Sequence, residues 1–176
     1  TDSAMIIDAM DILHSQKVDG FCLVSSDSDF TRLATRLRES GMLVIGLGER
    51  KTPAPFIVAC DKFIYIEILV HKEAEKASVS KGKTKTQQQD FEVVDKKFIR
   101  LIKQSIEDIA DDSGWAFLAE LGALIIKKKP DFDPRNYGFP KLSPLIKSLN
   151  KEILVDEREV ENTHIKHIYV KTINTK

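Results

Sequence analysis

One stretch near the beginning of the chain constrains the fold most: Phe21–Phe30, with the sequence FCLVSSDSDF. Its first four residues are apolar, a pattern typical of a strand that is buried on both faces in a parallel sheet. Asp27 and Asp29 follow, and after them apolar residues recur at helical spacing. The order is therefore strand, acidic turn and helix. Because ligands of open α/β sheets bind at the carboxyl ends of the strands, a site is expected at this turn.

The two aspartates of the turn have two interpretations. Neighbouring carboxylates repel each other, and a hard cation such as Mg2+ removes that repulsion, because it binds one or two carboxylates together with water. The structural alternative is that Ser28 or Asp29 caps the following helix by accepting hydrogen bonds from its first N–H groups. The motif alone leaves both interpretations open.

Composition bounds the rest of the chain only loosely. The chain has 176 residues, enough for one or two domains. It contains 27 basic and 27 acidic residues, so net charge neither indicates nor excludes a nucleic-acid partner. Cys22 and Cys60 lie in or beside apolar segments and are expected to be buried free thiols. No apolar run is long enough to cross a membrane and no signal peptide is recognisable, so we expect a cytoplasmic protein without membrane association.

The segments around the acidic turn complete an α/β domain. The pattern predicts a helix over Thr1–Ser15, a second buried strand over Met42–Leu47 and a third strand over Phe63–Val70. A short strand–helix–strand unit implies a right-handed parallel crossover. Since α/β domains normally begin with a strand, we expect that the beginning of this domain is missing from the chain.

A polar loop, Gly48–Thr52, follows the second strand and carries Arg50 and Lys51. The carboxyl ends of parallel strands share one edge of the sheet, so these two cations are predicted to meet a phosphate near the acidic turn. The alternative is that both are solvated loop charges.

Several spaced motifs of this region agree in order with those of one family: VSSDSDF, the helix ending in RLRESG, VIGLGERKTP and ACDKFIYIE. The region Thr1–Val70 resembles the NYN domain of the PIN-like nuclease superfamily. The resemblance implies an acidic cluster that holds Mg2+ or Mn2+ and cleaves RNA, formed by Asp2, Asp27 and Asp29. It also implies a first strand with a further Asp, for which this chain has no counterpart, and Gly where Ser26 stands.

The same turn fits a second enzyme motif. Asp27-x-Asp29-x-Thr31 after an apolar strand matches the DxDx[TV] pattern of haloacid-dehalogenase-like phosphatases, with the first Asp as nucleophile and the second as general acid/base. That fold also needs a downstream Lys and a later acidic pair at strand ends. The only later pair of adjacent aspartates, Asp111–Asp112, closes an amphipathic helix, so this alternative rests on a short motif alone.

The C-terminal part has the pattern of a winged helix-turn-helix. It follows a Lys-, Ser-, Thr- and Gln-rich segment that cannot build a core and is predicted to be a flexible linker. Helices are predicted to end near Asp112 and to cover Trp115–Ile126 and Lys141–Asn150. Ile153–Val155 and Ile165–Val170 are predicted to pair as a two-stranded wing.

Three features of this part carry a second resemblance: Gly114-Trp115, the segments LAELGALI and PDFDPRNYGFPKLSPLIKSL, and the final hairpin. They resemble the OST-HTH, or LOTUS, domain over Asp95 to Lys171. The resemblance implies binding of RNA, including G-rich structures, or docking of a helicase partner.

Basic residues of this half are candidate phosphate contacts, each with solvated surface charge as the alternative. They are Lys127, Lys128, Lys129, Arg135, Lys141 and Lys147. Lys141 and Lys147 are preferred because they lie near the presumed recognition helix. Four aromatic residues are predicted either to pack in the core or to stack on bases: Trp115, Phe132, Tyr137 and Phe139. His164 and His167 are predicted to be surface residues rather than metal ligands.

We therefore predict an α/β, PIN-like parallel-sheet domain that lacks its first strand, over residues 1–71, a linker over 72–94 and a small winged-helix domain over 95–176. The predicted function is a metal-dependent ribonuclease coupled to RNA binding, with activity expected when the nuclease domain is complete. The alternative is a non-catalytic RNA-binding or adaptor protein. RNA is the predicted partner, together with a helicase or other RNA-processing protein, and a homodimer is left open.

Overall fold

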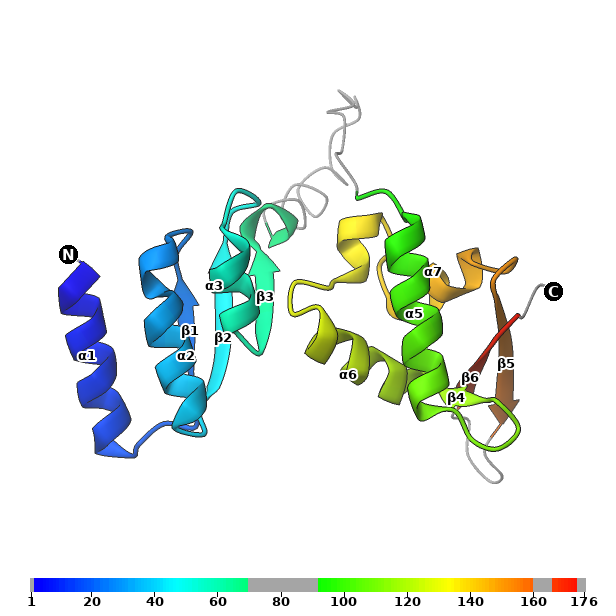
Figure 1. Ribbon diagram of the computed structural model, residues 1–176, viewed down its shortest axis with the longest axis horizontal. Helices are drawn as coiled ribbons and strands as arrows, with labels where there is room; N and C mark the ends of the chain where they lie inside the picture. The colour runs from blue at the N-terminus through cyan, green and yellow to red at the C-terminus, as the bar shows by residue number, and fades with distance from the viewer. Residues whose placement is uncertain (1, 70–91, 160–165, 174–176) are drawn as a thin grey trace, which may run out of the picture. The chain divides into compact units, whose positions relative to one another are not determined.

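The computed structural model describes residues 2–69, 92–159 and 166–173. It divides into two compact units, one formed mainly by the N-terminal part of the chain and one mainly by the C-terminal part (Figure 1). The predicted linker, residues 72–94, lies almost entirely outside the described residues. Its flexibility and the predicted domain boundaries therefore stay predictions.

The N-terminal unit is a parallel three-stranded sheet with helices packed on one of its faces. Its elements are α1 (Asp2–Ser15), β1 (Gly20–Val24), η1 (Ser28–Phe30), α2 (Thr31–Glu39), β2 (Leu43–Gly48), α3 (Ala54–Ala59) and β3 (Lys62–Tyr65). The strands lie in the order β1-β2-β3, with Phe21 opposite Val44 and Leu47 opposite Ile64. This architecture confirms the predicted α/β class and its parallel sheet.

The core of this unit lies between the sheet and the helices α2 and α3. Leu37, Val44 and Phe56 are fully buried there. The rings of Phe56 and Phe63 meet edge to face with their centroids 6.0 Å apart, an arrangement that aromatic pairs favour.

The opposite face of this sheet is open among the described residues. Val24 and Leu43 are 66% and 54% exposed, and Cys22 is exposed whereas Cys60 is buried. The predictions that the Phe21–Val24 strand is buried on both faces and that Cys22 is buried are therefore wrong. Side chains alternate along a strand, so helices on one face of the sheet bury only every second residue.

The third strand is shorter than predicted. It ends at Tyr65, opposite Gly48 at the end of β2, and residues 66–69 are helical. The prediction of a strand over Phe63–Val70 is wrong beyond Tyr65, because the neighbouring strand ends there and offers no further ladder partner. Tertiary context thus overrides the β propensity of the apolar sequence.

The C-terminal unit packs helices against a three-stranded antiparallel sheet. Its elements are α5 (Lys96–Ile109), β4 (Ala116–Phe117), α6 (Leu118–Lys128), η2 (Pro134–Tyr137), α7 (Leu142–Ser148), β5 (Ile153–Glu159) and β6 (Lys166–Thr172). The strand order is β4-β6-β5. The predicted wing exists, but it has gained a strand: Ala116 and Phe117, predicted to be helical, pair with Val170 and Tyr169.

Aromatic rings and helix caps organise the core of this unit. The ring of Phe98 on α5 stacks on Tyr137 and Phe132, with centroids 4.5 and 5.6 Å away. Asp95 caps α5 by accepting a 2.7 Å hydrogen bond from the Phe98 amide.

No helix among the described residues is both long and apolar enough to cross a membrane.

Candidate metal centre

The acidic turn is built where β1 ends. The Ser25 amide donates to the Leu47 carbonyl, and the Asp27 amide donates to Ser25 Oγ at 3.1 Å. Asp27 Oδ1 then accepts a 3.0 Å hydrogen bond from the Asp29 amide. Asp27 thus caps the 3-10 turn η1, which precedes α2. One of the two aspartates has the capping role of the structural alternative, but it is Asp27, whereas Ser28 or Asp29 was predicted for that role.

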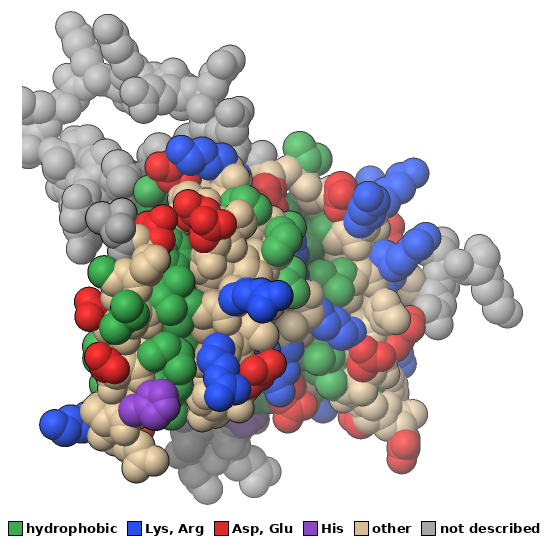
Figure 2. All heavy atoms as spheres, turned by 60° about the vertical axis from the view of Figure 1, so that its left-hand side comes forward, with side chains coloured by type: hydrophobic (Ala, Val, Ile, Leu, Met, Phe, Trp, Pro, Cys, Tyr) green, Lys and Arg blue, Asp and Glu red, His purple; other side chains and the backbone are tan. Residues whose placement is uncertain are grey.

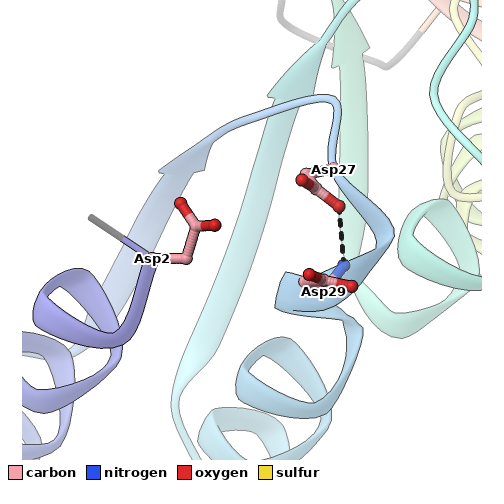
Figure 3. Close-up of side chains that lie close together, drawn as sticks. All are labelled: Asp2, Asp27 and Asp29. Atoms are coloured by element: carbon pink, nitrogen blue, oxygen red, sulfur yellow. Dashed lines mark hydrogen bonds between the residues drawn. The ribbon is translucent and has the colours of Figure 1, made fainter.

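Asp2 joins the two aspartates of the turn from a different element. It lies in the first turn of α1, and Figure 3 shows its carboxylate facing Asp27 and Asp29. One carboxylate oxygen from each of the three residues lies within 4.8 Å of the other two. The structure therefore brings together the three residues that the sequence singled out, although Asp2 is 25 residues from Asp27 in the chain.

The three side chains suit a hard divalent cation. All are exposed carboxylates, which are the oxygen ligands that Mg2+ and Mn2+ prefer. Among the described residues, no Lys, Arg or His forms an ion pair with any of them. Figure 2 shows acidic side chains gathered near the upper end of this face of the molecule, with hydrophobic side chains below them. A cation bound there would relieve the repulsion between the carboxylates.

The polar loop after β2 is attached to the acidic turn. The Glu49 amide donates a 2.8 Å hydrogen bond to Ser26 Oγ, so this loop and the turn meet at the carboxyl ends of neighbouring strands, as predicted. Its two cations already have neighbours. Lys51 Nζ lies 2.8 Å from Glu49, whose hydrogen bond raises the pKa of Lys51, and the Arg50 guanidinium lies 5.7 Å from the Tyr65 ring centroid.

Comparison with protein families accounts for both halves of the chain. A family model for the NYN domain matches residues 1–67, and one for the OST-HTH/LOTUS domain matches residues 89–165. The chain is an NYN domain followed by an OST-HTH/LOTUS domain. NYN domains are PIN-like nuclease domains that generally use divalent metals, so the pair supports an RNA-related module for cleavage and binding.

Other comparisons add little to this assignment. No curated protein matches the chain. Among solved structures, a solution NMR structure of an uncharacterized protein from Nitrosomonas europaea is 28% identical, with a TM-score of 0.42. The match covers 55% of this chain and 93% of that one.

Most predicted phosphate contacts of the OST-HTH/LOTUS domain are engaged in ion pairs. Lys128 Nζ lies 2.6 Å from Asp108, and Arg135 Nη2 lies 2.5 Å from Asp133. Lys147 pairs with Glu157, and Lys129 lies 3.7 Å from Asp131. Lys127 and Lys141 are exposed, and neither forms an ion pair within the described part of the chain. The predicted cations are thus distributed over α6, η2 and α7, and most are partly neutralised.

The predicted aromatic residues divide into two groups. Phe132 and Tyr137 are buried against Phe98, and Phe139 packs against the same core, so their predicted alternative as core residues is confirmed. Trp115 is half-buried beside the sheet of this domain. His164 lies outside the described residues.

A set of side chains beside Trp115 was not predicted from the sequence to be functional. Phe117, Arg158 and Tyr169 lie near it or near one another, and they come from all three strands of the OST-HTH/LOTUS sheet. His167, predicted to be a surface residue, lies 5.1 Å from the Phe117 ring and is half-buried. Alternation along the final hairpin was the available signal, but the register between β4 and β6 was needed to place Phe117.

Proposed function

We propose that the NYN domain is a metal-dependent ribonuclease in which Asp2, Asp27 and Asp29 bind Mg2+ or Mn2+. The observation that carries this proposal is the convergence of three carboxylates from α1 and the turn after β1, with oxygens within 4.8 Å of one another. The NYN match over residues 1–67 supports it. The haloacid-dehalogenase alternative, by contrast, explains only Asp27 and Asp29 and leaves Asp2 without a role.

The chemistry required is hydrolysis of a phosphodiester, in which negative charge develops on the scissile phosphate. A divalent cation stabilises such charge and lowers the pKa of an attacking water. The protein contributes three exposed carboxylates that bind the cation and leave room for a strand of RNA. Asp27 has a second role, because its Oδ1 accepts the Asp29 amide and so fixes the geometry of the turn.

The two roles of Asp27 are separable by substitution. Asn caps a helix about as well as Asp does, but it lacks the negative charge. Asp27→Asn is therefore expected to keep the turn and the stability of the domain while it weakens the cation site. Asp27→Ala removes both functions.

RNA cleavage in the presence of Mg2+ or Mn2+ tests the proposal. We expect the double variant Asp27→Asn/Asp29→Asn to lose at least about 100-fold in cleavage rate, since it loses both charges that the turn contributes to the metal site. Thermal unfolding of the same variant, without metal, serves as the control and is expected to match the wild type. Wild-type protein that binds RNA but leaves it intact with either metal would contradict the nuclease and favour the non-catalytic RNA-binding alternative.

A metal-binding measurement gives a readout that is independent of activity. A ligand that binds only the folded state raises the unfolding midpoint with its concentration. Mn2+ is expected to raise the midpoint of the wild type, and to do so much less for Asp2→Asn. A neutral control is Asp8→Asn, because Asp8 lies on the same helix but is not part of the cluster.

The OST-HTH/LOTUS domain supplies RNA binding in this proposal. A tethered binding domain raises the local concentration of RNA near the nuclease domain. A helicase or other processing partner, a homodimer and a cytoplasmic location stay predictions.

A further inference from the structure

The sheet of the OST-HTH/LOTUS domain has one face in the core and one face turned away from it. Ala116, Val170 and Ile153 are buried and point inward. The neighbouring positions on each strand point outward, because side chains alternate along a strand. We call this outward surface the aromatic face and define it by six residues: Trp115, Phe117, Arg158, His167, Tyr169 and Lys171.

Strand register brings these residues together from distant parts of the chain. Phe117 on β4 is opposite Tyr169 on β6, and His167 on β6 is opposite Arg158 on β5. The Phe117 ring lies 5.6 Å from the Tyr169 ring and 5.1 Å from the His167 ring. The result is a contiguous row of rings across two strands.

Two cations lie over the rings. The Arg158 guanidinium is 4.2 Å from the centroid of Tyr169 and 5.4 Å from that of Trp115. Lys171 Nζ is 6.0 Å from the Trp115 centroid. Asp156 accepts a 2.8 Å hydrogen bond from Arg158 Nε, which holds the guanidinium plane in place over the tyrosine.

The polar groups of this face are not fully used within the protein. Among the described residues, Trp115 Nε1 donates no hydrogen bond. Lys171 Nζ donates to the Ser113 carbonyl but lies near no carboxylate in the described part of the chain. Arg158 is paired with Asp156, as Lys128, Arg135 and Lys147 are with their own carboxylates. Lys171 is thus the cation of this face that has no carboxylate partner among the described residues.

Half-exposed rings with cations over them match the chemistry of single-stranded RNA. Unpaired bases stack on aromatic rings and on guanidinium planes, and the phosphates between them bind Lys and Arg. A purely aliphatic partner would leave the guanidinium, the indole N–H and the ammonium without acceptors. A contiguous apolar patch with a polar rim is itself a sign of an interaction site.

We propose that the aromatic face is the RNA-binding surface of this domain, where bases of single-stranded RNA stack on Trp115, Phe117 and Tyr169 while Arg158 and Lys171 contact phosphates. This inference rests on the proposed RNA-binding function. It assigns the RNA contacts to the sheet, whereas the predicted phosphate contacts lie on or next to α6, η2 and α7. His167 completes the row of rings.

Trp115 is the chain's single tryptophan, so its fluorescence reports directly on this face. The 176-residue chain carrying Asp27→Asn/Asp29→Asn, which is expected to leave RNA intact, is titrated with single-stranded RNA of about 12 nucleotides. Fluorescence anisotropy of labelled RNA measures binding in parallel. We expect Trp115 fluorescence to be quenched with the same dissociation constant that anisotropy gives.

Matched variants separate stacking from packing. Phe117→Leu/Tyr169→Leu keeps apolar bulk but removes the rings, and it is expected to weaken binding about tenfold. Phe139→Leu removes a ring that packs against the core of the same domain and is expected to leave affinity within about twofold. Arg158→Gln should lower the salt dependence of binding, whereas Arg100→Gln, at an exposed position of α5, should not. Far-UV circular dichroism of each variant verifies folding.

The outcomes distinguish this inference from the proposed function. RNA that binds with unchanged Trp115 fluorescence, or with equal affinity for Phe117→Leu/Tyr169→Leu, overturns the aromatic face alone. The absence of any RNA binding overturns the aromatic face together with the RNA-binding role of the domain, and a protein partner becomes the alternative. Cleavage by the wild type is measured separately and tests the nuclease proposal.

Discussion

The two sheets of this protein each have one face in a core and, among the residues that the structure describes, one open face, but the open faces differ in chemistry. The open face of the parallel sheet is aliphatic and includes Val24 and Leu43, which are 66% and 54% exposed. The open face of the antiparallel sheet carries aromatic rings with cations over them, such as Arg158 over Tyr169.

The comparison shows that the functional residues lie at different parts of the two kinds of sheet. A parallel sheet gathers the ends of its strands at one edge, and the NYN domain carries its acidic residues there rather than on a face. An antiparallel sheet commonly keeps one face for the core and exposes the other, so the exposed face can bind a ligand. An aliphatic open face indicates a contact but carries no groups that identify the partner.

The largest expected effect tests whether the open face of the parallel sheet is accessible. Cys22 is exposed on that face, while burial raises the pKa of the Cys60 thiol to about 11. At pH 8 only about one thousandth of a thiol with such a pKa is thiolate, and the thiolate is the reactive form. Iodoacetamide labelling followed by mass spectrometry should therefore modify Cys22 at least about 100-fold faster than Cys60.

A control variant completes the cysteine experiment. Cys22→Ser leaves one thiol, which should stay unlabelled at pH 8 and become reactive as the pH rises toward 11 or when urea unfolds the domain. Slow labelling of Cys22 in the native wild type would show that this face is covered in solution, and the contrast between the two sheets would then fail.

The next effect tests whether the two cores are separate. Leu37 and Ile125 are fully buried in the NYN and OST-HTH/LOTUS cores, and truncating either to Ala is expected to cost about 3 kcal/mol of unfolding free energy. Trp115 fluorescence reports only on the second domain. In urea titrations Ile125→Ala should shift the fluorescence midpoint, and Leu37→Ala should shift only the circular dichroism. A shift of the fluorescence midpoint by Leu37→Ala would mean that the domains unfold together.

A smaller effect tests how tightly the strand ends are packed. A Cβ at Gly48 would lie 2.5 Å from the Ser25 carbonyl oxygen and 2.7 Å from Thr52 Oγ1. Gly48→Ala is therefore expected to cost about 2 kcal/mol and to reduce Mn2+ binding, because it displaces the start of the acidic turn. Gly41→Ala is the control: its φ of +82° makes Ala strained, yet no atom lies within 4 Å. Equal losses of Mn2+ binding in the two variants would contradict this explanation.

The smallest expected effect compares two capping aspartates. Asp95 caps α5 through the Phe98 amide and has no part in the acidic cluster. Asp95→Ala should lower the unfolding free energy by about 1 kcal/mol, and Asp95→Asn should leave it nearly unchanged. Neither should alter RNA cleavage, in contrast to Asp27→Asn. A loss of cleavage in either Asp95 variant would contradict this expectation, because neither substitution touches the acidic cluster.

Much of the fold was predictable because its signals are local. The strand, the acidic turn and the helix of the NYN domain lie within about twenty consecutive residues, and the helices of the second domain follow from apolar spacing. The strand–helix boundaries at Tyr65 and Trp115 were not predictable in this way. Each depends on whether a partner strand is present, and a short apolar run is compatible with either structure.

The residues of the candidate sites were likewise predictable only in part. Family resemblance picked out Asp2, Asp27 and Asp29, and their chemistry follows from residue type. The pairing of Lys128 and Lys147 did not follow, because their carboxylate partners, Asp108 and Glu157, come from other elements of the fold. Local sequence carries no information about which acid a surface lysine will meet.

The sequence by itself thus determined the two families, the acidic turn and the types of secondary structure, since these are encoded in short-range pattern and side-chain chemistry. The tertiary structure decided which faces stay open, which cations are paired and that Trp115, Phe117, Arg158 and Tyr169 form one surface. The register between neighbouring strands decides which side chains share a face. A shift of one residue between β4 and β6 would turn Phe117 to the face opposite Tyr169, and the packing of the core specifies which register forms.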